Sequence, residues 1–222
     1  MTMARFLALT AAFALVAGPA LANRPSALVE EVSDKVAGVQ IMDTLTVGRK
    51  IVLGSKQRLV LSYLISCTNE TITGGTVTVG GRESTVTGGT VERTALPCDG
   101  GALLLAANES GKAGVSVMRD APVGPPDAKP RPQITLHKTC PLIVVPAPGR
   151  VLFEPLEGAA EPVAVDVPGK MLDLAKEGAT GRTALTPGAL YRVTAGGKSY
   201  IVRVDAAAKD GGGPALGRLI RF

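Results

Sequence analysis

Three cysteines, Cys67, Cys98 and Cys140, carry the most specific chemistry in this sequence of 222 residues. In an exported protein, which the first residues of the chain indicate, such thiols tend to oxidise to disulfides. Three cysteines allow three single pairings. Cys67 and Cys98 lie in one β-rich segment and would close a loop of about 32 residues, worth roughly 3–4 kcal/mol in the chain-entropy treatment. We therefore predict a Cys67–Cys98 disulfide, which leaves Cys140 either as a free thiol or as a crosslink between chains.

The sequence offers few residues that could form a catalytic or metal-binding site. His137 is the only histidine, and it stands three residues before Cys140, a spacing that on a strand turns the two side chains to opposite faces. A nucleophile usually needs a base within hydrogen-bond reach, so we expect no Cys–His pair. The sequence has no metal-ligand spacing such as Cys-x-x-Cys, and its Gly-Gly pairs lack the following Lys-Ser/Thr and helix of a phosphate loop. We predict no catalytic residue, no metal and no cofactor.

Carboxylates leave one enzymatic alternative open. A pair of carboxylates that hydrolyses a bond needs no proximity in the sequence. The adjacent Glu30 and Glu31 are expected to face solvent. A secreted hydrolase with a site built from dispersed carboxylates is therefore the alternative to a non-enzymatic protein.

Residues 1–22 have the parts of a secretory signal peptide. Arg5 supplies the positive charge, residues 6–17 form an apolar run, and residues 20–22 (ALA) give a small-x-small cleavage pattern. We predict that the mature chain begins at Asn23, has no transmembrane anchor after cleavage, and is periplasmic or secreted.

The charge of the chain is modest and dispersed. Lys and Arg number 24 against 19 Asp and Glu, and aromatic residues make up 3%. The basic residues are scattered singly among acids, whereas nucleic-acid binding favours clusters of them beside stacking aromatic side chains. We therefore expect no nucleic-acid partner. Hydrophobic residues make up 45%, which is enough for a folded core.

Five prolines between residues 119 and 132 predict a stiff linker, although a long loop within one domain would fit the same stretch. The linker separates a first domain, residues 23–118, from a second, residues 133–222. Both contain short alternating or β-branched runs punctuated by Gly and Pro. We predict an all-β chain of two small antiparallel, sandwich-like domains.

In the first domain, apolar residues alternate over residues 58–67 and predict a strand with one buried face. That face comprises Leu59, Leu61, Tyr63, Ile65 and Cys67. Residues 27–36 fit either a helix or two short strands.

A sequence echo, ITGGTVT at 72–78 and VTGGTVE at 86–92, predicts two strands of one sheet. Each would be entered through a Gly-Gly bend and would turn its Thr residues to a wet face. Thr76 and Thr78 on that face are our candidates for a partner-facing strand, because a flat, weakly charged face suits docking or strand addition.

The second domain has seven candidate strands, with a helical turn at 171–176. The strands are residues 133–136, 142–145, 151–154, 163–167, 190–194, 199–204 and 219–222. Gly196-Gly197 tolerates a type I′ turn and predicts a hairpin in which Val193 opposes Tyr200 and Tyr191 opposes Val202 on the core face.

The first domain resembles a known group of sequences. The runs GRKIVLG at 48–54, YLISC at 63–67, ETITGGTVTVG at 70–80 and CDGG at 98–101 resemble a group of uncharacterised exported proteobacterial proteins. That group is in turn distantly similar to FecR-type periplasmic domains. The resemblance implies an all-β domain, and FecR-type domains relay signals from outer-membrane receptors. It carries over no functional residue.

These observations favour a non-enzymatic exported envelope protein that acts as a binding, scaffolding or signal-relay module. The scarcity of histidine and aromatic side chains supports this expectation, because substrate pockets usually recruit them. A protein partner in the envelope is expected. The sequence leaves open the identity of that partner and the oligomeric state.

Overall fold

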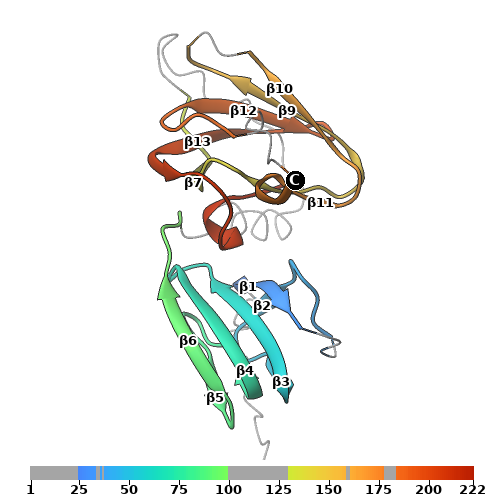
Figure 1. Ribbon diagram of the computed structural model, residues 1–222, viewed down its shortest axis with the longest axis vertical. Coiled ribbons are helices and arrows are strands. Elements are labelled where there is room, and N and C mark those ends of the chain that lie inside the picture. The colour runs from blue at the N-terminus through green and yellow to red at the C-terminus, as the bar shows by residue number, and fades with distance from the viewer. Residues whose placement is uncertain (1–24, 34–35, 37, 100–129, 159–160, 178–183) are drawn as a thin grey trace, which may run out of the picture.

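The computed structural model describes residues 25–33, 36, 38–99, 130–158, 161–177 and 184–222. These residues form two β-rich lobes, one above the other in Figure 1, which we call the N-terminal lobe (25–99) and the C-terminal lobe (130–222). The all-β prediction is confirmed. The predicted signal peptide, most of the predicted linker and the last residues of the predicted first domain lie outside the described residues.

One six-stranded antiparallel sheet makes up the N-terminal lobe, with the strand order β2-β1-β3-β4-β5 and β6 also paired with β4. Its strands are β1 (Pro25–Val32), β2 (Thr44–Thr46), β3 (Lys50–Tyr63), β4 (Thr68–Thr78), β5 (Thr85–Thr87) and β6 (Thr90–Ala95). The ambiguous stretch at 27–36 is therefore a strand as far as Val32, because it pairs with both β2 and β3.

The inward face of β3 follows the predicted alternation. Leu59, Leu61 and Tyr63 are fully buried. Ile65 was expected on the same face but is 56% exposed, because β3 ends at Tyr63 and the chain turns before it. Leu64, the first residue after β3, is buried as well, since it packs against the C-terminal lobe.

The two Gly-Gly pairs of the sequence echo lie against each other. β4 continues as one strand through Gly74-Gly75, where both glycines have positive φ and the register with β3 shifts, whereas Gly88-Gly89 separates β5 from β6. A Cβ atom at Gly75 would lie 2.5 Å from the Thr87 carbonyl oxygen. The glycines thus allow the backbones of β4 and the β5–β6 edge to approach closely.

The C-terminal lobe is built from two sheets, of order β10-β9-β12-β13-β7 and β11-β8-β14. Its elements are β7 (Ile134–Lys138), β8 (Leu142–Val144), β9 (Gly149–Pro155), β10 (Val163–Val167), β11 (Met171–Asp173), α2 (Leu174–Glu177), β12 (Leu190–Ala195), β13 (Lys198–Lys209), η1 (Ala215–Gly217) and β14 (Leu219–Arg221). Side chains from both sheets, among them Phe153 and Ile143, share one core.

All seven predicted strands of this lobe are present, with two differences. The predicted helical turn at 171–176 begins as strand β11, and helix starts only at Leu174. The pairings β13–β7 and β14–β8 are parallel, because β7 and β14 do not follow their partners through a tight hairpin.

The predicted hairpin is confirmed in register. Val193 pairs with Tyr200 and Tyr191 with Val202. Gly196 and Gly197 have φ values of 53° and 79°, as the two central positions of a type I′ turn require.

Candidate functional site

The two lobes contact each other through a small apolar cluster, which we call the lobe junction. Its buried members are Leu28, Leu64, Leu142, Ala215, Leu216 and Leu219. Leu28 comes from β1 and Leu64 from the turn after β3, and the others come from β8, η1 and β14. The junction buries apolar surface that each lobe alone would expose to water.

Hydrogen bonds flank the lobe junction. The Leu216 amide donates to Glu30 Oε1 at 3.2 Å, and Arg221 Nη1 donates to the Met42 carbonyl at 3.2 Å. The Thr135 amide donates to Asp99 Oδ2 at 3.4 Å. Polar contacts of this kind fix the orientation of an apolar contact, because they are directional.

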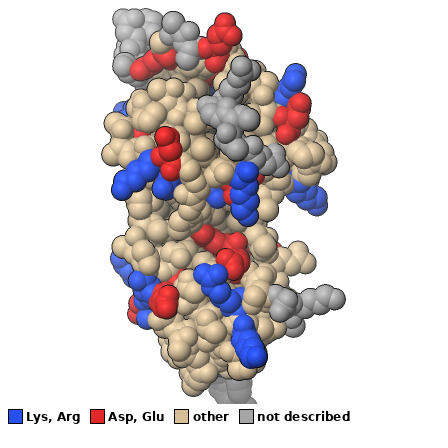
Figure 2. Space-filling view, viewed as in Figure 1, with Lys and Arg blue, Asp and Glu red and all other residues tan. Residues whose placement is uncertain are grey.

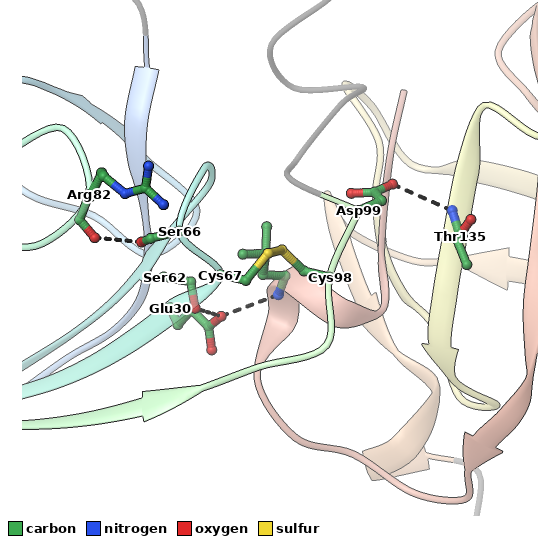
Figure 3. Close-up of a disulfide and its surroundings, with 9 residues drawn as sticks. Glu30, Ser62, Ser66, Cys67, Arg82, Cys98, Asp99 and Thr135 are labelled. Carbon is green, nitrogen blue, oxygen red and sulfur yellow. Dashed lines mark hydrogen bonds between the residues drawn. A yellow bond between two sulfur atoms is a disulfide. The ribbon is translucent and has the colours of Figure 1, made fainter.

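The predicted disulfide is confirmed and lies beside the lobe junction. Cys67 and Cys98 are bonded, with Cα atoms 5.8 Å apart. Figure 3 shows the bond between the Glu30–Ser62 and Asp99–Thr135 contacts. Cys98 packs against the lobe junction, so the disulfide fixes the C-terminal end of the N-terminal lobe beside this junction. Cys140 is a free, buried thiol.

A cleft of about 660 Å³ opens next to the lobe junction, with walls from both lobes. Its apolar lining is Ile41, Met42, Val60, Leu142, Met171, Ala175 and Ala215. Its charged lining is Glu30, Glu31, Asp173, Lys176 and Arg218. Acidic atoms lie at the waist between the lobes in Figure 2, with basic side chains above and below them. Junctions between domains are common places for binding pockets.

A β-bulge brings both glutamates of the acidic pair to this cleft. The register on β3 shifts between Val29, which pairs with Leu61, and Glu31, which pairs with Val60. The extra residue, Glu30, breaks the alternation of side chains along β1. The prediction that both glutamates face solvent is therefore wrong for Glu30, which is half-buried, and right for Glu31, which is exposed.

Glu30 is tied into the contact between the lobes through one oxygen. Its Oε1 atom accepts hydrogen bonds from Ser62 Oγ at 2.5 Å and from the Leu216 amide at 3.2 Å. Ser62 Oγ in turn accepts from Asn69 Nδ2 at 2.9 Å. Within the described residues, Oε2 of Glu30 has no hydrogen-bond partner. Glu31 instead forms an exposed ion pair with Arg58 at 2.9 Å.

An ion pair between buried Arg218 and half-buried Asp173 forms the opposite wall. Arg218 Nη1 and Nη2 donate to the two carboxylate oxygens of Asp173 at 2.6 and 2.8 Å. Burial alone would raise the pKa of Asp173, but the hydrogen bonds and charge of Arg218 outweigh it, with help from the Ala175 amide and Lys176. The pKa of Asp173 therefore lies below its ordinary value of 3.8.

The structure does not bring His137 and Cys140 into contact. His137 Nδ1 lies 3.4 Å from Asp205 Oδ2, and Cys140 Sγ lies 3.8 Å from Thr139 Oγ1. No cluster of three or more His, Cys, Asp or Glu side chains that could hold a metal occurs in the part of the chain that the structure describes.

The predicted partner-facing residues Thr76 and Thr78 lie on the outer face of the N-terminal sheet, in a row with other threonines. Thr76 pairs with Thr87, and Thr78 pairs with Thr85. Both predicted residues are half-buried, and Val52, which pairs with Thr76 on β3, is 73% exposed. We call this surface, formed by the five residues just named, the Thr face. It is separate from the cleft, to which Thr76 and Thr78 contribute no side chain.

Sequence reasoning missed the cleft. Ile41, Met42 and Met171 carry no motif, and Asp173 and Arg218 stand 45 positions apart. The one usable signal was the adjacent pair Glu30-Glu31. On a strand, adjacent side chains normally point to opposite faces, so the two glutamates are not expected to share one surface.

Comparisons of the chain with family models, with curated proteins and with solved structures found no match. Among the described residues, no helix combines the length and the apolar character that a membrane span needs.

Proposed function

We propose that the protein is a non-enzymatic module of the cell envelope that binds a protein partner, with a scaffolding or signal-relay role. The observation that carries this proposal is the cleft at the lobe junction, which has an apolar lining from both lobes and in which Asp173 is paired with Arg218 and Glu31 lies in an ion pair with Arg58. Its periplasmic or secreted location rests on the predicted signal peptide. A relay role rests on the resemblance to FecR-type domains.

The state of the cleft carboxylates supports binding over catalysis. A general acid must carry a proton at the working pH, which requires a raised pKa. Asp173 has a lowered pKa and is held by Arg218. Glu30 holds the Leu216 amide across the lobe contact. Both carboxylates have structural partners, which favours a contact surface.

One observation favours the alternative, a secreted hydrolase: Glu30, Glu31 and Asp173 line the same cleft. Such an enzyme would lose its activity when a single carboxylate is neutralised. Purified mature protein should therefore be assayed with peptide, ester and glycoside substrates beside the variants Glu30→Gln and Glu31→Gln, two residues that line the cleft. Turnover well above buffer that either variant abolishes would establish the enzyme and refute the binding module.

Photocrosslinking in the exporting cell tests the binding module directly. A benzophenone amino acid in place of Ile41, which lines the cleft, should capture a defined envelope protein. The same probe in place of Val52 reports on the Thr face and also tests the partner-facing role proposed for Thr76 and Thr78. Capture from neither position would count against partner binding at both surfaces.

A further inference from the structure

Strand β11 leaves one edge of the three-stranded sheet unpaired beside the cleft. β11 is the terminal strand of the order β11-β8-β14. The Val145 amide donates to the Lys170 carbonyl, so these two residues form a hydrogen-bonded pair. Hydrogen-bonded and non-hydrogen-bonded pairs alternate along an antiparallel ladder. Leu172 therefore exchanges backbone hydrogen bonds with β8, and Met171 does not. In the described structure, the N–H and C=O groups of Met171 therefore face the free edge. An unpaired edge of this kind is a template for an added strand.

Apolar side chains flank that edge from both lobes. Ile41 is 47% exposed and Met171 is 46% exposed, and both line the cleft. They are two of the five large hydrophobic residues with high exposure in the described chain. Met42 completes this lining from the N-terminal lobe. Methionine is flexible and polarizable and adapts to different apolar partners.

The charge of the cleft is uneven. Its two cations, Lys176 and Arg218, both act on Asp173, and Glu31 is paired with Arg58. Glu30 is held only by the neutral donors Ser62 and Leu216. Its negative charge is therefore the one in the lining that no described cation neutralises, and it complements a basic side chain.

We propose that the cleft binds an extended peptide segment of the partner, which adds as a strand to the free edge of β11. Apolar side chains of the segment lie between Ile41 and Met171, and a Lys or Arg side chain reaches Oε2 of Glu30. The proposal rests on the binding function proposed above and names its site and the chemistry of the ligand. Main-chain hydrogen bonds supply affinity in this mode, and alternate side chains supply specificity.

The probe for this proposal is a set of capped, fluorescein-labelled hexapeptides of the pattern Ser-Φ-Thr-Lys-Thr-Φ, in which Φ is Val, Leu or Ile and the two Φ side chains share one face of the strand with Lys. Fluorescence anisotropy with the oxidised mature protein should give dissociation constants of about 10–100 µM for the best members, because a three-residue edge offers few hydrogen bonds. Methylation of alternate peptide nitrogens should abolish binding, and Glu in place of Lys should weaken it about tenfold.

Matched protein variants locate the site. Met171→Asp and Ile41→Asp should each weaken binding by about tenfold or more. Glu30→Gln keeps an oxygen for Ser62 and Leu216 but removes the charge, so it should weaken binding about threefold to tenfold and only for Lys-containing peptides. Val52→Asp, at an exposed position on the Thr face, should leave binding unchanged. All four positions accept a polar residue without opening a core, so the thermal midpoints should stay close to wild type.

Three results would overturn the peptide site. They are no binding by any peptide of the set, binding that tolerates N-methylation, and binding that Val52→Asp removes while Met171→Asp does not. Each of these results leaves the binding module standing if the Ile41 or Val52 photocrosslink still captures a protein. Substrate turnover abolished by Glu30→Gln would overturn the proposed function itself.

Discussion

Among single residues, two carboxylates make structural contacts in different lobes: Glu70 is buried and Asp173 is half-buried. Glu70 of β4 is fully buried and accepts the Ser84 amide with both oxygens, at 3.0 and 3.1 Å. Arg93 Nε donates to it at 2.8 Å. These bonds fix the loop after β4 against the sheet. The Tyr63 hydroxyl and Ser84 Oγ also form a hydrogen bond there, at 2.7 Å. Burial raises the pKa of Tyr63, so its hydroxyl stays protonated at neutral pH.

Glu70→Gln should destabilise the N-terminal lobe by about 2–3 kcal/mol, because it removes charge-assisted hydrogen bonds from a buried site. Urea unfolding followed by circular dichroism measures the change. Glu92→Gln is the control, since Glu92 is exposed on β6 and should change stability by less than about 0.5 kcal/mol. Equal effects of the two variants would show that the buried contacts of Glu70 add no more to the free energy of unfolding than an exposed glutamate does.

Asp173 makes stability depend on pH in the acid range. Its pKa is lowered in the folded protein, so its contribution is complete above the ordinary pKa of 3.8 and disappears as the pH falls through the lower folded value. Asp173→Asn should cost about 3–5 kcal/mol at pH 7, because it leaves Arg218 buried without its partner.

Thermal unfolding from pH 7 down to pH 2 tests both statements. The difference between wild type and Asp173→Asn should shrink as the pH falls below about 4. Asp166→Asn is the matched control, because Asp166 pairs with Arg150 in an exposed position and should have little effect at any pH. A difference between wild type and Asp173→Asn that stays constant from pH 7 to pH 2 would contradict the assignment of a lowered pKa.

At the scale of elements, glycine decides how the strands of the N-terminal sheet fit together. Gly75 has a φ of 80° and lies against the Thr87 carbonyl and Gly89. The sequence echo therefore marks a place where two backbones meet, next to outward positions on β4 and β5 that are threonine, namely Thr76, Thr78, Thr85 and Thr87. β-branched side chains fit such a pleated surface.

Gly75→Ala should destabilise the lobe by at least about 2 kcal/mol. A positive φ costs a residue with a Cβ atom about 1–2 kcal/mol, and the new methyl group would also press on Thr87. The thermal midpoint by circular dichroism measures the loss. Gly81→Ala, where an added Cβ atom meets nothing within 4 Å, should leave the midpoint nearly unchanged; a similar drop for both variants would refute the close-contact explanation.

At the scale of the whole molecule, the disulfide and the lobe junction act at the same place. Leu96 donates its amide to the Cys67 carbonyl at 2.7 Å, and Cys98 packs on the junction. The two features together hold the end of the N-terminal sheet against the C-terminal lobe. The cleft takes its walls from both lobes, so its shape depends on this contact.

Cys67→Ser/Cys98→Ser should lower stability by about 3–4 kcal/mol, the value expected for a loop of this length. The Leu216 amide, bonded to Glu30 across the contact, should exchange with deuterium faster. Dithiothreitol should produce the same two changes in the wild-type protein and none in the double variant. An unchanged exchange rate at Leu216 would show that the disulfide does not stabilise the contact between the lobes.

Local sequence patterns predicted the features that depend on near neighbours in the chain. Alternation at Leu59, Leu61 and Tyr63 identified a strand and its buried face, because side chains change sides with each residue. The turn at Gly196-Gly197 set the hairpin register for the same reason. The Cys67–Cys98 pairing followed from two thiols in one β-rich segment.

The candidate site, by contrast, depends on contacts between segments that are far apart in the chain. A bulge of one residue moved Glu30 from solvent to the cleft, and such a shift depends on how β1 pairs with β3. Asp173 and Arg218, 45 positions apart, met because β11 and β14 flank the same strand, β8. Ile41 and Met171 face one cleft because the two lobes contact each other. Contacts between distant segments are set by the packing of whole elements, which local sequence patterns do not encode.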